Sequence, residues 1–168
     1  LEITELDNTA REIYLAAENR AVLLMNSGKL KAMTLSEEGG DSVRLKPLGA
    51  ASGAAGGGAE AAKTYYIYYD AKAPGDSAGA LAELLPEGAI DPALRKGAFY
   101  IVYEIAGGES TNGAGSVTDV FYAEDTSAGA LGDPDDFSKF YYEGREASRE
   151  TRIKDKRMFG YYGGEAAD

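Results

Sequence analysis

The stretch LEITELDNTAREIYLAAENRAVLLMNSG, residues 1–28, decides the fold of this 168-residue chain. Its apolar residues recur in steps of three and four, which places them on one side of an α-helix. They are Leu1, Ile3, Leu6, Ala10, Ile13, Ala17, Ala21 and Leu24. Asn26, Ser27 and Gly28 then provide a stop, because Asn and Gly tolerate the left-handed backbone that closes a helix. We predict a long amphipathic helix over 1–28 whose apolar face packs on the rest of the domain.

The composition is that of a soluble globular protein with an acidic surface. Apolar residues make up 44% and charged residues 27% of the chain, and the net charge is -11. Binding to a phosphate backbone or to anionic lipid requires a concentration of Lys and Arg that this balance disfavours. We therefore expect no nucleic-acid partner.

Cysteine and histidine are absent from the sequence. Without them there is no disulfide, no usual zinc, copper or iron ligand set, and no thiol nucleophile or imidazole base. Catalysis would have to use carboxylates, Ser, Lys or Tyr alone. We predict that the protein is not an enzyme and has no catalytic residues and no cofactor.

Three segments have the pattern of β-strands. Residues 64–70 are aromatic and β-branched, and residues 98–106 and 116–124 alternate between two faces. The Gly-rich stretch 107–115 joins the last two, which predicts an antiparallel hairpin. The predicted fold class is α+β, with the long N-terminal helix packed on an antiparallel sheet of three or more strands.

The alternation also predicts which side chains share a face of the sheet. In the second strand it sets Phe99, Ile101, Tyr103 and Ile105 against Tyr100, Val102 and Glu104. In the third strand it sets Val120 and Tyr122 against Val117, Phe121 and Ala123.

We predict a single domain over 1–168. Residues 49–63 are almost entirely Gly and Ala, which predicts a mobile loop. Residues 64–124 form the sheet region and include a short predicted helix over 77–85, capped by Ser77. A single helical turn is predicted over 91–95, and residues 133–168 form a charged C-terminal segment.

The charge spacing in the C-terminal segment predicts a solvated helix over 143–156. The same segment contains a cluster of basic residues. These are Arg145, Arg149, Arg152, Lys154, Lys156 and Arg157. One interpretation is that they pair with neighbouring acidic residues, namely Glu143, Glu146, Glu150 and Asp155. The other is a basic surface that contacts an acidic face of a second subunit, as in head-to-tail filaments. Both remain open.

Several runs resemble the soluble part of type IV pilin-like proteins, including the pseudopilins of type II secretion. The resemblance is greatest to prepilin-type proteins of a Gram-positive group. The runs are AREIYLAAEN (10–19), YYIYY (65–69), LLPEGAIDPAL (84–94), FYIVYE (99–104), VTDVFYAE (117–124) and FGYYGG (159–164). They are spread over most of the chain.

The resemblance implies that the helix of residues 1–28 is the second half of a longer one. In such proteins the first half is apolar, anchors the subunit in the membrane and then forms the filament core. It implies a structural subunit of a pilus or pseudopilus-like surface filament or secretion assembly, located at the cell surface. Its partners would be other pilin-like subunits. The aromatic run at 159–164 suggests that the native chain continues past Asp168.

Two alternative functions are kept. The chain has 12 tyrosines, and a tyrosine-rich face predicts a secreted or surface-attached module that binds a glycan or a protein. Packing of these tyrosines in the core and on the sheet is the favoured interpretation. An enzyme that uses paired carboxylates, such as a glycosidase, ranks third.

One metal site is a candidate. Asp133, Asp135 and Asp136 supply carboxylates on a short stretch, which suits the oxygen ligands of Ca²⁺. The simpler interpretation is a solvated turn at a helix start, where aspartate is favoured. We favour the simpler interpretation because the spacing of an EF-hand loop is missing.

Overall fold

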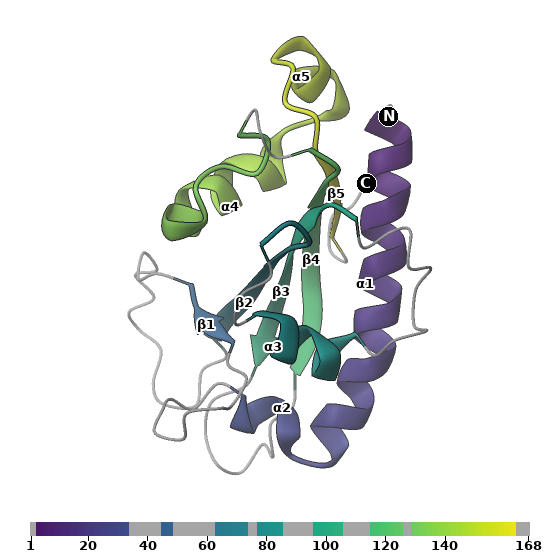
Figure 1. The fold of residues 1–168 in the computed structure, drawn as a ribbon, viewed down its shortest axis with the longest axis vertical. Coiled ribbons are helices and arrows are strands. Elements are labelled where there is room, and N and C mark those ends of the chain that lie inside the picture. The colour runs from purple at the N-terminus through teal and green to yellow at the C-terminus, as the bar shows by residue number, and fades with distance from the viewer. Residues whose placement is uncertain are drawn as a thin grey trace.

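The computed structural model describes residues 3–33, 45–48, 63–73, 77–85, 96–105, 115–125 and 129–163. In these ranges the chain is an α+β protein whose long N-terminal helix packs on a five-stranded antiparallel sheet (Figure 1). This confirms the predicted fold class. The predicted loop over 49–63 and the predicted turn over 91–95 lie outside the described residues, except for Lys63, which begins a strand.

Helix α1 (Ile3–Asn26) is the predicted amphipathic helix. It buries the predicted apolar stripe from Ile3 to Leu24 and, in addition, the carboxylate residue Asp7. Gly28 follows it with a φ of 78°, the left-handed conformation expected at a helix end. The short helix α2 (Lys29–Ala32) comes next and was not predicted.

The five strands lie side by side in sequence order, each antiparallel to the next. They are β1 (Lys46–Pro47), β2 (Lys63–Asp70), β3 (Ala98–Ile105), β4 (Gly115–Ala123) and β5 (Gly160–Gly163). The three predicted strands are the central ones, and Ile101 of β3 lies opposite Ile67 of β2 and Val120 of β4. The C-terminal aromatic run provides β5 at one edge, and β1 forms the other edge.

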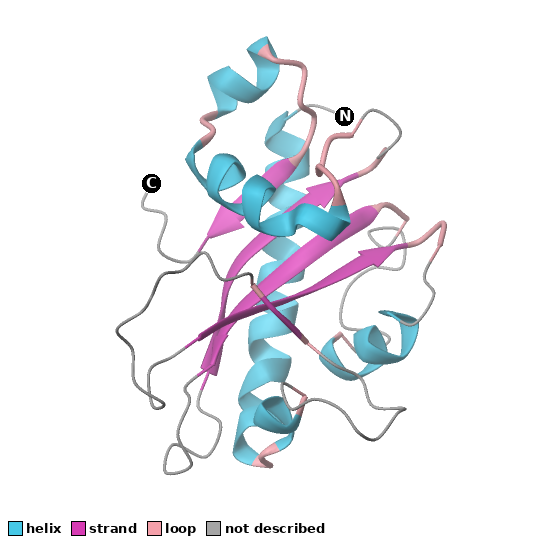
Figure 2. Ribbon diagram, turned by 90° about the vertical axis from the view of Figure 1, so that its left-hand side faces the viewer, coloured by secondary structure: helices cyan, strands magenta, loops and turns pink. Residues whose placement is uncertain are grey.

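Each face of the sheet carries its own hydrophobic cluster. Helices α1 and α3 (Ser77–Leu84) cover one face and contribute to the cluster around Ile101 and Tyr103. Helix α4 (Phe137–Glu146) covers the other face, where the cluster includes Tyr100 and Phe121 (Figure 2). The predicted alternation along β3 is therefore correct.

The prediction for β4 is wrong at one residue. Val102 pairs with Asp119, but the next residue, Tyr103, pairs with Val117, so Thr118 is an extra residue in the ladder. Such a bulge reverses the alternation beyond it. Val117 consequently lies in the cluster under α1 together with Val120, and not with Phe121 as predicted.

The predicted helix over 143–156 is two helices in the structure. Helix α4 ends at Glu146, and α5 (Arg149–Lys154) begins after Ser148, whose hydroxyl accepts a hydrogen bond from the Thr151 amide at 3.1 Å. The segment is solvated as predicted except at Gly144 and Arg152, which are buried. Ser148 is a recognisable helix-capping residue. The prediction of one continuous helix relied on the spacing of charges and did not take this signal into account.

Candidate functional site

Helix α1 has an outward face with three exposed apolar side chains. Leu15, Val22 and Leu23 are 42%, 46% and 59% exposed, respectively. Leu15 and Val22 are seven residues apart and so project from the same side of the helix. We call Leu15, Val22 and Leu23 the outer face of α1. It lies away from the buried stripe that packs on the sheet.

The first turns of α1 are held by a buried ionic cluster around Asp7, which is 7% exposed. Its Oδ1 accepts hydrogen bonds from the Tyr161 amide and from Nη1 of Arg152, both at 2.8 Å. Its Oδ2 accepts from Nε of Arg149 at 2.6 Å and from Nη2 of Arg152 at 3.5 Å. We call Asp7, Arg149, Arg152 and the Tyr161 amide the Asp7 cluster. It joins α1, α5 and β5.

The Asp7 cluster also covers the outer edge of β5. The Tyr161 amide donates to Asp7, and the carbonyl of Phe159 just before the strand accepts a 2.7 Å hydrogen bond from Nη1 of Arg152. A terminal strand exposes backbone groups that can pair with another chain. Here side chains from α1 and α5 occupy two of these groups, the Tyr161 amide and the Phe159 carbonyl.

A second ionic cluster lies on the α4 face around Asp119, which is fully buried. Its Oδ2 accepts a 3.1 Å hydrogen bond from Nε of Arg145 and another from the hydroxyl of Tyr161. Burial, followed by the nearby Asp119 carboxylate, raises the pKa of the Tyr161 phenol. Tyr161 therefore contacts both clusters, through its amide on one side and its hydroxyl on the other.

These contacts correct the predicted pairing of the basic segment. Arg145 pairs with Asp119, and Arg149 and Arg152 pair with Asp7, all of them distant in sequence. Among the described ion pairs, only Arg157–Glu143, at 3.6 Å, uses one of the predicted acidic partners, and these two residues are not neighbours in sequence. The sequence did not indicate these roles for Asp7 and Asp119, although an aspartate within the apolar stripe of a helix is a detectable signal.

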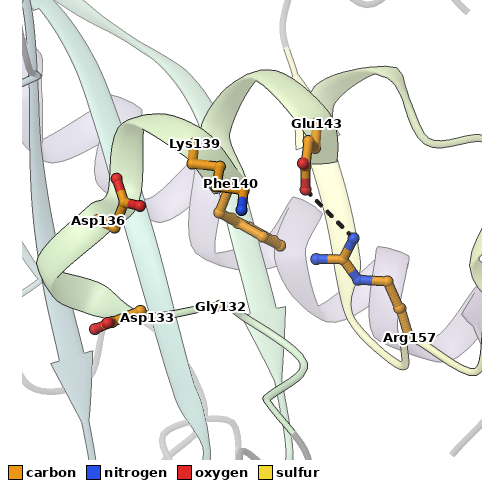
Figure 3. A pocket seen from close by; sticks show the side chains of 7 residues that line it. All are labelled: Gly132, Asp133, Asp136, Lys139, Phe140, Glu143 and Arg157. Atoms are coloured by element: carbon orange, nitrogen blue, oxygen red, sulfur yellow. Dashed lines mark ion pairs between the residues drawn. The ribbon is translucent and has the colours of Figure 1, made fainter.

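The three candidate calcium ligands lie at the start of α4. Asp133 caps the 3₁₀ helix η5 (Pro134–Asp136), and its Oδ1 accepts a 2.9 Å hydrogen bond from the Asp135 amide. Asp133 and Asp136 also line a pocket of about 380 Å³ (Figure 3), whose remaining lining residues are Gly132, Lys139, Phe140, Glu143 and Arg157. Within the described part of the chain no three acidic side chains are grouped closely enough to hold a metal ion. The calcium site stays a prediction, which a calcium titration followed by thermal unfolding would test.

Most tyrosines of the sheet are packing residues, as favoured above. Tyr100 and Tyr103 are completely buried, and their hydroxyls have no hydrogen-bond partner among the described residues. Tyr66 and Tyr68 of β2 are only partly buried and pack against Tyr100. Burial, followed by the Asp70 carboxylate, raises the pKa of Tyr68 to about 12.

No described helix combines the length and the apolar character needed to cross a membrane. Comparisons with protein-family models, with curated proteins and with solved structures found no significant match for this chain.

Proposed function

We propose that the chain is a structural, non-catalytic subunit of a pilus or pseudopilus-like surface filament or secretion assembly. The observation that supports this most directly is the two-sided character of α1. Its inner face packs on the sheet, while its outer face presents Leu15, Val22 and Leu23 to solvent. A helix that packs one face on the sheet and exposes apolar side chains elsewhere fits a role between the sheet and a neighbouring subunit.

The outer face alone supports only a weak contact. Complete burial of one such side chain contributes about 1.5–3 kcal/mol, and these three are already about half buried. The remaining gain is on the order of 3 kcal/mol per subunit, compared with about 8 kcal/mol for a micromolar complex. The proposal therefore includes a further contact, an apolar helical segment N-terminal to α1 that anchors the subunit in the membrane and packs in the filament.

In this proposal the partners are other pilin-like subunits, and the described domain lies at the cell surface. The encoded sequence upstream of Leu1 provides the first test. A Gly-Phe-Thr-Leu-x-Glu start followed by about 20 apolar residues would support the proposal. A cleavable secretory signal ending in Ala-x-Ala would contradict it and favour a free binding module.

Cross-linking provides the second test. Because residues 1–168 contain no cysteine, a single introduced cysteine is the only thiol in this part of the protein. We expect the full-length protein with Val22→Cys, labelled with a photoreactive thiol reagent, to form cross-linked dimers in the cell envelope, because such a reagent also reaches a different residue of a head-to-tail neighbour. Lys72→Cys, at an exposed position in the turn after β2, is the matched control and should remain monomeric. Equal dimer yields at the two positions, or none at Val22→Cys, would contradict a contact through the outer face.

A further inference from the structure

The most unusual residue of α1 is Asp7, a carboxylate within an otherwise apolar stripe. An apolar residue at position 7 is expected to make the folded protein as stable as Asp7 does, or more stable. The reason is that burying charges costs several kcal/mol per ion. The best-documented role of buried ionic groups is to select one packing arrangement of the helices over alternative arrangements. The position of Asp7 in the second turn of α1 therefore requires a reason other than stability.

The geometry of the Asp7 cluster suggests that reason. Apolar burial has no preferred direction, whereas hydrogen bonds constrain both distance and angle. All four hydrogen bonds that Asp7 accepts come from α5 and β5, which lie near the N-terminal end of α1 (Figure 1). They fix the position of α1 along its axis and its rotation about that axis.

A close backbone contact at the same turn also constrains the position of α1. A Cβ atom on Gly160 of β5 would fall 2.0 Å from the carbonyl oxygen of Leu6, so the two backbones touch directly. Further along, α1 is held at other points, where the Tyr14 hydroxyl donates a 2.8 Å hydrogen bond to the Val117 carbonyl and Glu18 accepts a 2.9 Å hydrogen bond from the Val117 amide. The constraints on the N-terminal end of α1 therefore include those at Leu6 and Asp7.

We infer that Asp7 is a positioning residue that sets how α1 presents its outer face and in which direction its N-terminal end leaves the domain. The functional part rests on the proposed assembly through α1. Because α1 is one continuous helix, a displacement at Asp7 is transmitted to Val22, about 22 Å further along the axis. Neighbouring subunits would then meet the outer face at a different height or angle.

The test measures the position of α1 in variants that remain folded, so a change in position is distinguished from a loss of stability. Spin labels on Val22→Cys and Lys72→Cys report the distance between α1 and the end of β2, with no native thiol to interfere. In the wild-type background we expect one narrow distance distribution. In Asp7→Leu/Arg152→Leu, which leaves no buried charge in the cluster, we expect the chain to remain folded and the distribution to broaden at least about twofold.

The matched control is Glu83→Gln, which removes the partly exposed ion pair between α3 and α1 and keeps the 2.9 Å hydrogen bond from Nε of Arg20 to the Glu83 carbonyl. This variant should keep the narrow distribution. If Asp7→Leu/Arg152→Leu fails to fold, Asp7→Asn/Arg152→Met replaces it, since this variant keeps an oxygen for the Tyr161 amide and leaves no buried charge. An unchanged distribution in the tested cluster variant would overturn the inference. The readout is made on monomers, so it is independent of whether the outer face mediates assembly.

Discussion

The Asp7 carboxylate accepts a 2.8 Å hydrogen bond from Nη1 of Arg152, which lies 145 positions later in the chain. Both side chains are almost completely removed from water. The pair connects the second turn of the first helix to the last helix, and so links the two ends of the described chain. Its energetics should therefore differ from those of the exposed ion pairs.

Removing one partner of this pair should be strongly destabilising. We expect Asp7→Ala to lower the free energy of unfolding by about 3–5 kcal/mol, because Arg152 would remain as an uncompensated buried charge. A double-mutant cycle with Arg152→Ala, measured by urea denaturation, gives the coupling energy. The cycle for Arg20 and Glu83, whose side chains are 30% and 41% exposed, should give less than about 1 kcal/mol. Equal coupling in the two cycles would contradict this prediction.

Replacing Lys156 should stabilise the protein. Lys156 has a φ of 58°, and the Arg157 amide donates to the Arg152 carbonyl at 2.9 Å, the pattern that ends a helix with a left-handed residue. Glycine adopts this conformation more readily, so Lys156→Gly should gain about 1 kcal/mol and raise Tm by about 2–4 °C. Lys154→Gly, within α5, should lower Tm by a similar amount. A decrease in Tm for Lys156→Gly would contradict the expectation.

Two tyrosine hydroxyls should have opposite effects when removed. The Tyr103 hydroxyl is buried without a hydrogen-bond partner among the described residues, whereas the Tyr161 hydroxyl donates to Asp119. We expect Tyr103→Phe to leave the free energy of unfolding unchanged or to raise it by about 1 kcal/mol. Tyr161→Phe should lower it by about 1–3 kcal/mol, because a buried carboxylate loses a donor. Chemical denaturation of both variants measures the difference, and a larger loss for Tyr103→Phe would refute it.

The protein should lose stability in alkali. Burial and then the Asp70 carboxylate raise the pKa of Tyr68 from 10.0 to about 12. Burial, followed by Glu18, also raises the pKa of Tyr103. A phenol with a raised pKa favours the folded state below pH 10, and this contribution is lost as pH rises through the folded-state pKa. Urea midpoints should therefore fall from pH 10 to 12. The fall should be smaller in Tyr68→Phe, and an identical pH profile for this variant would contradict its role.

The sequence predicted the elements whose periodicity is local. The helix stripe from Ile3 to Leu24 and the alternation along β3 follow from repeats of 3.6 and two residues, which need no knowledge of distant contacts. Periodicity did not predict the extra residue Thr118, because a bulge depends on how β4 pairs with β3. The same limit explains why Val117 was placed on the wrong face.

The partners of the arginines could not be predicted from sequence. Local spacing favoured Glu143, Glu146, Glu150 and Asp155, since side chains three or four residues apart are close on a helix. In the structure the chain interrupts that helix at Ser148 and brings Arg149 and Arg152 to Asp7. For the outer face of α1, the sequence shows only that Leu15, Val22 and Leu23 are apolar and lie outside the main stripe. Their exposure is known from the structure.

By itself the sequence determined the fold class, the long helix and the central three strands, because hydrophobic periodicity fixes which side of each element is buried. Only the tertiary structure decided that Asp7 and Asp119 would bind arginines and that Tyr161 would contact both. The physical reason is that ion pairing depends on distance and on exclusion of water, and both arise only when the first helix and the last strand come together.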